Sequence, residues 1–155
     1  MPTPRTLFLV DVSGFIHRAF HAVRPLATSR GFPTNALYGL ATMLKKFARE
    51  RQPQYCALAF DAGRETFRNT MFADYKANRP PAPRELALQF PIASKLAAAM
   101  GFPVIEVPGF EADDLIATLA ARARAEGFEV VIESGDKDLL QLVGPGILAH
   151  DPLKD

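Results

Sequence analysis

Residues 6–10 read TLFLV, an apolar run that ends at Asp11. Such a run is typical of a strand that is buried on both faces of a sheet. Residues 55–60 read YCALAF, a second run of the same kind, and it ends at Asp61. Both runs therefore predict central strands, each followed directly by an aspartate.

Strand-like and helix-like segments alternate along the rest of the chain. Three shorter strands are expected, at 104–107, 129–133 and 147–149. Apolar residues recur at helical spacing in five further segments, namely 13–23, 34–51, 85–100, 111–126 and 137–143. This alternation predicts a three-layer α/β fold with a mainly parallel sheet and helices on both faces. The length of 155 residues fits one such domain.

The composition excludes several classes of protein. Apolar residues make up 48% and charged residues 23% of the chain, which argues against wholesale disorder. A single cysteine, Cys56, rules out an intramolecular disulfide and fits a reducing compartment. No apolar run approaches the roughly 20 residues that a membrane-spanning helix needs.

The net charge of +1 conceals two oppositely charged portions. Residues 1–100 carry 14 Lys and Arg against 6 Asp and Glu, whereas residues 101–155 carry 4 against 11. A basic and an acidic portion in one domain favour a polyanionic partner together with a cation site. Chance segregation of surface charge is the alternative.

Seven carboxylates follow the ends of predicted strands. Ligands of open α/β sheets bind outside the carboxyl ends of the strands, so these side chains are expected at one edge of the sheet. Hard divalent ions such as Mg²⁺ or Mn²⁺ prefer oxygen ligands, and two of them can hold a phosphodiester. The seven are Asp11, Asp61, Glu111, Asp113, Asp114, Asp136 and Asp138.

Each carboxylate also has a simpler explanation. Aspartates after strands often serve as turn residues or helix caps, and acids in a first helical turn favour the helix dipole. On a helical wheel Glu111 and Asp114 share a face, while Asp113 lies on another. Three more acids, Glu126, Glu129 and Glu133, are expected to be solvated surface charges or charges at the edge of a strand. If two metal ions bind here and hold a phosphodiester, Asp61→Ala should abolish metal-dependent cleavage of that phosphodiester with little unfolding of the protein.

Residues 64–84 mix basic and aromatic side chains. Cations for phosphates and aromatic faces for bases are what single-stranded nucleic acid binding requires. The alternative is an amphipathic helix that buries its aromatic side chains. The basic residues are Arg64, Arg68, Lys76, Arg79 and Arg84, and the aromatic residues are Phe67, Phe72 and Tyr75. The three histidines, His17, His21 and His150, lack metal-ligand spacing and are expected to be structural.

Six stretches resemble one family, in the family's order and over nearly the whole chain. The family is the 5′→3′ exonuclease, or flap-endonuclease-like, domain at the N-terminus of bacterial DNA polymerase I and of related stand-alone exonucleases. The stretches are GFPTNA (31–36), AFDA (59–62), TFR (66–68), YKANRPP (75–81), GFEADD (109–114) and SGDKDLLQL (134–142).

The resemblance implies a PIN-like fold and divalent-metal hydrolysis of DNA that has a free 5′ end or flap. It implies that all seven carboxylates bind metal, directly or through water. Lys76 and Arg79 would act on the scissile phosphate from a helical arch, with Tyr75 stacked on a base. Arg18 would lie near the phosphates. With Arg68, Phe72 and Arg84, these residues form the expected DNA-binding set.

Members of that family continue into further acidic ligands and a helix-hairpin-helix element, so residues 1–155 are expected to be an N-terminal portion, with a polymerase as a possible continuation. The resemblance also implies a bacterial cytoplasmic location, at the nucleoid. Two other functions remain open: a non-catalytic module that binds single-stranded or flap DNA, and a PIN-type ribonuclease.

Overall fold

The computed structural model describes residues 3–62, 83–152 and 154. Within these residues, five parallel strands form one sheet in the order β3-β2-β1-β4-β5. The strands are β1 (Thr6–Asp11), β2 (Tyr55–Ala59), β3 (Val104–Ile105), β4 (Glu129–Glu133) and β5 (Ile147–His150). The predicted parallel sheet is therefore confirmed, with strand ends shifted by two residues or fewer.

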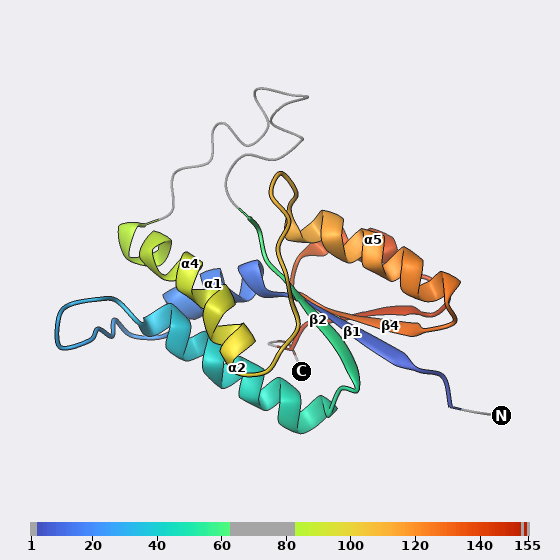
Figure 1. The fold of residues 1–155 in the computed structure, drawn as a ribbon, viewed down its shortest axis with the longest axis horizontal. Helices are drawn as coiled ribbons and strands as arrows, with labels where there is room; N and C mark the ends of the chain where they lie inside the picture. Colours follow the sequence, from blue (N-terminus) through green and yellow to red (C-terminus); the bar gives the residue numbers. More distant parts are fainter. Residues whose placement is uncertain (1–2, 63–82, 153, 155) are drawn as a thin grey trace.

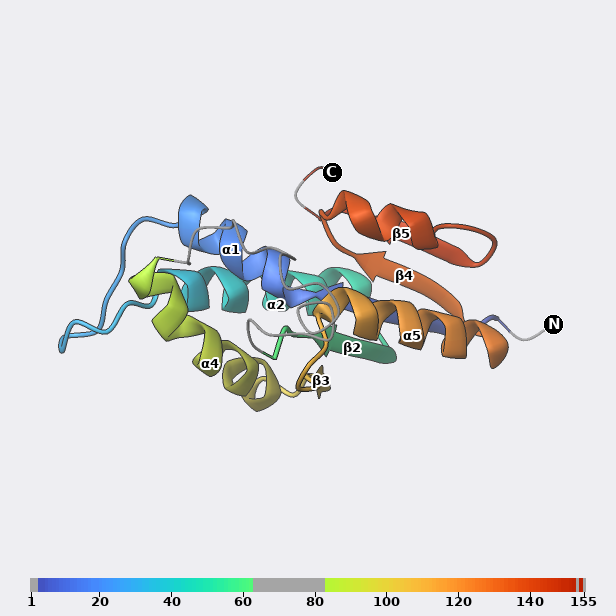
Figure 2. The ribbon, with the colours of Figure 1, turned by 90° about the horizontal axis from the view of Figure 1, so that it is seen from above.

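Four α-helices and one 3₁₀-helix are described, and they cover both faces of the sheet. They are α1 (Val12–Ala22), α2 (Asn35–Arg51), α4 (Arg84–Ala99), α5 (Ala112–Ala125) and the 3₁₀-helix η1 (Lys137–Leu142). Helices α1, α2 and α4 lie together on one side of the strands, and α5 lies on the other (Figure 1). Figure 2 shows the same separation from above. The expected three-layer arrangement is confirmed. No described helix is long and apolar enough to cross a membrane.

Side-chain alternation along the strands builds two hydrophobic cores. Val10 and Leu58 face the core under α1, α2 and α4, while their strand neighbours Leu9 and Ala57 face the core under α5. Because the central strands are buried on both faces, their sequences read as continuous apolar runs. For this reason β1 and β2 could be predicted from the sequence.

A buried polar cluster joins the helices of the first core. The side chain of Gln89 on α4 is fully buried. Its Nε2 donates to Oδ1 of Asn35 (2.9 Å), and its Oε1 accepts from the backbone N–H of Leu37 (3.0 Å). Asn35 Nδ2 in turn donates to the carbonyl of Phe20 (2.9 Å). Helix α4 is thus fixed against α1 and α2 by a hydrogen-bond network that apolar periodicity does not reveal.

Of the two alternatives expected for Glu133, the solvated surface charge is wrong, because the residue ends β4 and is buried. Its side chain, at the end of β4, is 3% exposed and accepts from Arg51 Nε (3.1 Å). The second carboxylate oxygen lies 2.6 Å from Nδ1 of His150 on β5. Burial of this charge is tolerated because both oxygens have polar partners. The cluster joins the end of α2 to the β4–β5 edge, and it gives His150 the structural role expected from the sequence.

Glu133→Gln is expected to lower the free energy of unfolding by about 2 kcal/mol, because Arg51 and His150 lose a charged hydrogen-bond acceptor. Urea denaturation followed by circular dichroism measures the change. Glu129→Gln is the matched control, since Glu129 lies on the same strand, pairs with Arg124 at 3.4 Å and is 46% exposed. Its expected cost is below about 0.5 kcal/mol. Equal losses in the two variants would contradict the structural role of Glu133.

Candidate metal centre

The strand order places a crevice between β1 and β4. The chain proceeds from β1 outward to β2 and β3, and then returns to the other side of β1 with β4. Connections therefore leave β1 and β4 in opposite directions, which opens a space beyond their carboxyl ends. Asp11 ends β1, and Ser134 and Asp136 follow β4. The topology itself therefore brings together Asp11 and Asp136, which are 125 positions apart in the chain.

A cavity of about 530 Å³ occupies this space. Six of the seven carboxylates predicted from the sequence line it: Asp11, Asp61, Glu111, Asp113, Asp136 and Asp138. Carboxylate oxygens of Asp11, Asp113 and Asp136 lie within 4.8 Å of one another. A set made only of carboxylate oxygens fits a hard divalent cation rather than a soft one.

Asp114 is the seventh predicted carboxylate, and the structure places it differently. Its Oδ2 accepts from the backbone N–H of Glu111 (3.1 Å), which caps the N-terminus of α5, and the side chain does not line the cavity. The helical wheel grouped Asp114 with Glu111, but here Asp113 lines the cavity beside Glu111. The proposed ligand role of Asp114, direct or through water, stays a prediction.

Two serines hold the aspartates in position, and sequence reasoning missed both. The Ser134 hydroxyl donates to Oδ2 of Asp11 (2.9 Å) and accepts from the backbone N–H of Asp136 (3.0 Å). On the other side, Ser13 Oγ accepts from the backbone N–H of Asp61 (3.0 Å). Position alone could have suggested Ser13, because it lies two residues after a strand-end aspartate.

Asp61 and Asp136 are each part of a helix N-terminus. Asp61 Oδ1 accepts from the backbone N–H of Ala112 at the start of α5 (2.6 Å). Asp136 Oδ1 accepts from the N–H of Asp138 at the start of η1 (2.9 Å). The simpler reading of these acids as helix caps is thus correct, and it is compatible with a position in the cavity.

Burial and mutual repulsion make the cluster electrostatically unfavourable. Burial raises the pKa of Asp113 to about 7, and the charges of Asp11, Asp136, Glu111 and Asp61 add to the effect. Burial also raises the pKa of Asp11 above its ordinary value, although the hydrogen bonds from Ser134 and Gly14 oppose the shift. A site that disfavours its own negative charge gains from a bound cation.

This arrangement predicts the pH dependence of stability without metal. Between pH 4 and about 7, Asp113 keeps its proton in the folded chain but ionises in the unfolded chain. The folded state binds more protons in this range, so the free energy of unfolding falls as pH rises and is lowest above about pH 7. Urea denaturation in EDTA at pH 5 and pH 8 checks this expectation. Parallel profiles for the parent and Asp113→Asn would contradict it, since the variant should lose this part of the pH dependence.

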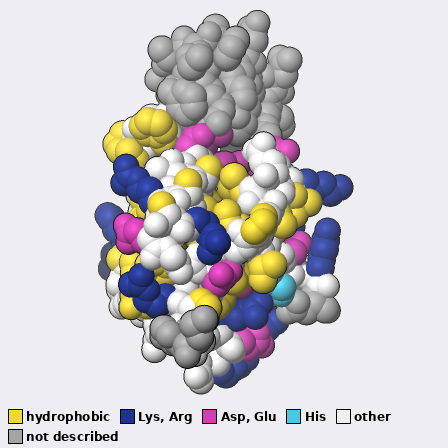
Figure 3. Space-filling model, turned by 90° about the vertical axis from the view of Figure 1, so that its right-hand side faces the viewer, with side chains coloured by type: hydrophobic (Ala, Val, Ile, Leu, Met, Phe, Trp, Pro, Cys, Tyr) yellow, Lys and Arg dark blue, Asp and Glu magenta, His cyan; other side chains and the backbone are white. Residues whose placement is uncertain are grey.

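The basic residues are placed less completely than the acidic ones. Arg18 on α1 lines the cavity, and Arg84 begins α4 on the surface. His17 also lines the cavity, and its ring meets Phe90 edge-on with centroids 5.4 Å apart. Five of the predicted DNA-contacting residues lie outside the described residues: Arg68, Phe72, Tyr75, Lys76 and Arg79. On the face that Figure 3 shows, basic, acidic and apolar side chains are interspersed.

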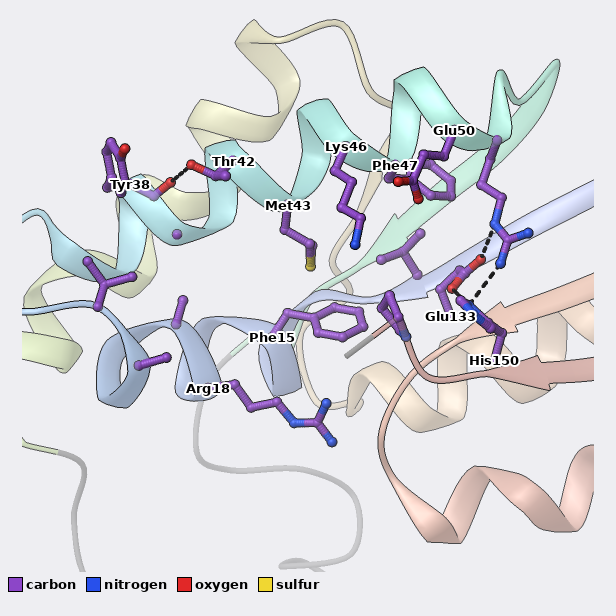
Figure 4. Close-up of a pocket in the computed structure, with 17 residues that line it drawn as sticks. Phe15, Arg18, Tyr38, Thr42, Met43, Lys46, Phe47, Glu50, Glu133 and His150 are labelled. Atoms are coloured by element: carbon purple, nitrogen blue, oxygen red, sulfur yellow. Dashed lines mark hydrogen bonds and ion pairs between the residues drawn. The ribbon is translucent and has the colours of Figure 1, made fainter. Parts of the chain in front are cut away.

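A second cavity, of about 330 Å³, lies between α1 and α2 (Figure 4). Its walls are largely apolar, with Phe15, Met43 and Phe47 prominent among them, and Glu133 lies at one end with its charge paired to Arg51. Such a lining does not suit a bare cation. The carboxylate cavity is therefore the candidate metal centre.

Comparison with known proteins decides the family. The profile of the family described as "5′-3′ exonuclease, N-terminal resolvase-like domain" matches residues 6–154. The chain belongs to this family. A 5′-3′ exonuclease of Aquifex aeolicus is 46% identical over 151 residues, which cover 97% of the chain and 52% of that protein. A DNA polymerase I of Bacillus caldotenax is also 46% identical, over 143 residues that cover 92% of the chain.

The chain spans about half the length of the Aquifex exonuclease and 16% of the Bacillus polymerase. Among solved structures, the T5 D15 protein co-crystallised with metal ions has a TM-score of 0.73 at 20% identity, over 96% of the chain and 56% of that protein. A T5 D15 flap endonuclease (D155K) in a pseudo-enzyme-product complex with DNA and metal ions has a TM-score of 0.66 over 96% of the chain. The similarity to the T5 protein supports the resolvase-like fold of this exonuclease-family domain.

Proposed function

We propose that this exonuclease-family domain carries the metal site of a 5′ nuclease that hydrolyses DNA phosphodiesters, with a free 5′ end or a 5′ flap as its substrate. The observation that carries the proposal is the single cavity lined by six carboxylates at the carboxyl ends of β1 and β4. Family membership supports it, because relatives of the chain are named 5′-3′ exonuclease and DNA polymerase I.

Divalent cations, Mg²⁺ or Mn²⁺, fit this donor set. Mg²⁺ usually takes only one or two protein carboxylates and keeps several waters, so six carboxylates favour two ions rather than one. Asp11, Asp113 and Asp136 would hold a cation, and Asp61, Glu111 and Asp138 would hold a second or act through water. The bound cation would supply a water of lowered pKa and offset negative charge on the phosphodiester.

The chain's own residues would keep the cluster ready for this role. Ser134 fixes the Asp11 carboxylate, and Ser13 fixes the backbone at Asp61. Arg18, on the cavity rim, would contact a phosphate oxygen of the bound strand. Lys76 and Arg79 would contribute further positive charge at the scissile phosphate. A chromosomal DNA substrate would place the protein in the bacterial cytoplasm, at the nucleoid.

A 5′-labelled flap duplex, incubated with the chain in Mn²⁺ and in EDTA, tests this function. Cleavage that needs the metal supports it. Metal-independent binding of the flap without cleavage would contradict the nuclease function and indicate a non-catalytic DNA-binding module. Faster cleavage of an RNA strand of the same sequence would replace it with a PIN-type ribonuclease.

The basic and aromatic side chains of residues 64–84 lead to a separate prediction. Lys76→Ala should slow cleavage and reduce by about one the number of phosphate charges that the chain neutralises, which lowers the slope of log K against log salt. Fluorescence anisotropy with a short single strand, at four or five salt concentrations, measures the slope. Lys95→Ala is the control, because Lys95 is an exposed lysine on α4. A Lys76→Ala slope equal to that of the control would exclude a phosphate contact at Lys76.

A further inference from the structure

Arg18 is held by an ion pair that could not be predicted from the sequence. Its Nη1 donates to Oδ1 of Asp151 (3.0 Å), and its Nη2 donates to Oδ2 (3.3 Å). The two side chains come from α1 and from the residue after β5, 133 positions apart in the chain. Asp151 is 14% exposed and Arg18 is 35% exposed, so the pair is shielded on the aspartate side. Paired bonds of this kind fix the plane of the guanidinium as well as its distance.

Gly135 leaves room for that orientation. A methyl group built at Gly135 would overlap Nη2 and Cζ of Arg18, so the guanidinium packs directly on this glycine. Gly135 stands between Ser134, which holds Asp11, and Asp136, which lines the cavity. The guanidinium therefore packs on the turn that carries Asp136, one of the carboxylates that line the cavity. In Figure 4, Arg18 extends from α1, and Phe15 lies between Arg18 and α2.

We propose that Asp151 is a positioning residue, which holds the Arg18 guanidinium at the rim of the carboxylate cavity in the orientation that binds a phosphate oxygen of the DNA. An arginine has five N–H donors in a rigid fork, and the Asp151 pair uses two of them, so Arg18 can bind a carboxylate and a phosphate together. The proposal rests on the proposed nuclease function for its effect on DNA, but the positioning itself is a property of the protein alone.

The sign of one effect separates positioning from simple charge masking. Removing a carboxylate near bound DNA strengthens binding when electrostatics alone decide it. If Asp151 only masked Arg18, Asp151→Asn would therefore raise kcat/KM. If Asp151 positions Arg18, Asp151→Asn lowers kcat/KM although it removes a negative charge. We expect a fall of about tenfold, and a smaller fall for Asp151→Glu, which keeps the charge but moves it.

The experiment is a double-mutant cycle on 5′-flap cleavage in Mn²⁺, with the parent, Asp151→Asn, Arg18→Ala and the double variant. Because positioning acts through Arg18, Asp151→Asn should have no further effect when Arg18 is already alanine. A tenfold loss in both backgrounds would overturn the proposal, since Asp151 would then support the fold by another route. Glu129→Gln, which breaks the Arg124 ion pair at the opposite end of β4, is the control and should leave kcat/KM unchanged.

A readout without DNA separates this inference from the proposed function. In nitrogen-15 NMR spectra of the parent, the Arg18 Nη–H signals should show restricted rotation and slow exchange with water, because both Nη atoms donate to Asp151, and Asp151→Asn should remove both effects. Unchanged signals would overturn the positioning role whether or not the protein is a nuclease. If the signals change as expected but the parent neither binds nor cleaves DNA, the proposed function is wrong, and the phosphate-binding part of this inference is wrong with it.

Discussion

Replacing Asp113 by Asn is expected to stop metal-dependent cleavage while making the metal-free protein more stable. The charged form of Asp113 is disfavoured, because this side chain is partly buried and surrounded by the charges of Asp11, Asp136, Glu111 and Asp61. A neutral amide removes that repulsion and removes a ligand at once. We expect cleavage to fall at least about 100-fold, and the Tm in EDTA at pH 8 to rise by about 3 °C.

Thermal denaturation with and without Mn²⁺ measures the ligand role directly. Ions that bind the folded state raise its Tm by mass action, and this increase should be largely lost in Asp113→Asn. Asp114→Asn is the informative comparison, because Asp114 is the next residue but caps α5, and an amide oxygen can still accept from Glu111 N–H. Its loss of activity should be at least about tenfold smaller. Equal losses in the two variants would contradict the conclusion that Asp114 acts mainly as a cap of α5, and would support a ligand role for it.

Asp61→Ala is expected to have two effects, of which the sequence predicted only one. Loss of the carboxylate should reduce metal-dependent cleavage by about 100-fold or more. From the sequence alone, little unfolding is expected. The structure changes that expectation, because Asp61 Oδ1 accepts from the backbone N–H of Ala112 and caps α5. Removal of such a cap costs about 1 kcal/mol of stability.

Asp61→Asn separates the two effects of Asp61. Asparagine keeps an oxygen that can accept from Ala112 but loses the negative charge. We therefore expect Asn and Ala variants to be equally inactive, while urea denaturation finds only the Ala variant destabilised. Full stability of Asp61→Ala would show that the α5 cap contributes little, and retained cleavage in either variant would remove Asp61 from the site.

The sequence was most informative where burial and chain direction alone decide the structure. Central parallel strands are buried on both faces, so β1, β2 and β4 could be located from their apolar runs. All strands run in one direction, so residues after the strand ends had to meet at one edge. Those two facts were enough to predict the fold and to place six of the seven carboxylates at the cavity that the structure contains.

The rotation of α5 about its own axis could not be predicted from the sequence. Asp113 and Asp114 are neighbours about 100° apart around α5, and both fit an acidic first turn equally well. Periodicity gives the relative positions of residues on a helix but not which of two polar flanks faces a cavity. The cap that Asp114 makes with Glu111 N–H places Asp114 at the helix end and leaves Asp113 to line the cavity.

Hydrophobic burial and strand direction act through local pattern, so the layered parallel fold and the edge at which its acids gather could be predicted from the sequence. The contacts between distant residues could not be predicted in this way: Ser134 on Asp11, Glu133 buried against Arg51, and Asp151 on Arg18. These are directional polar contacts between side chains more than 80 positions apart. Their geometry depends on how helices and strands pack, and no local pattern in the chain encodes it.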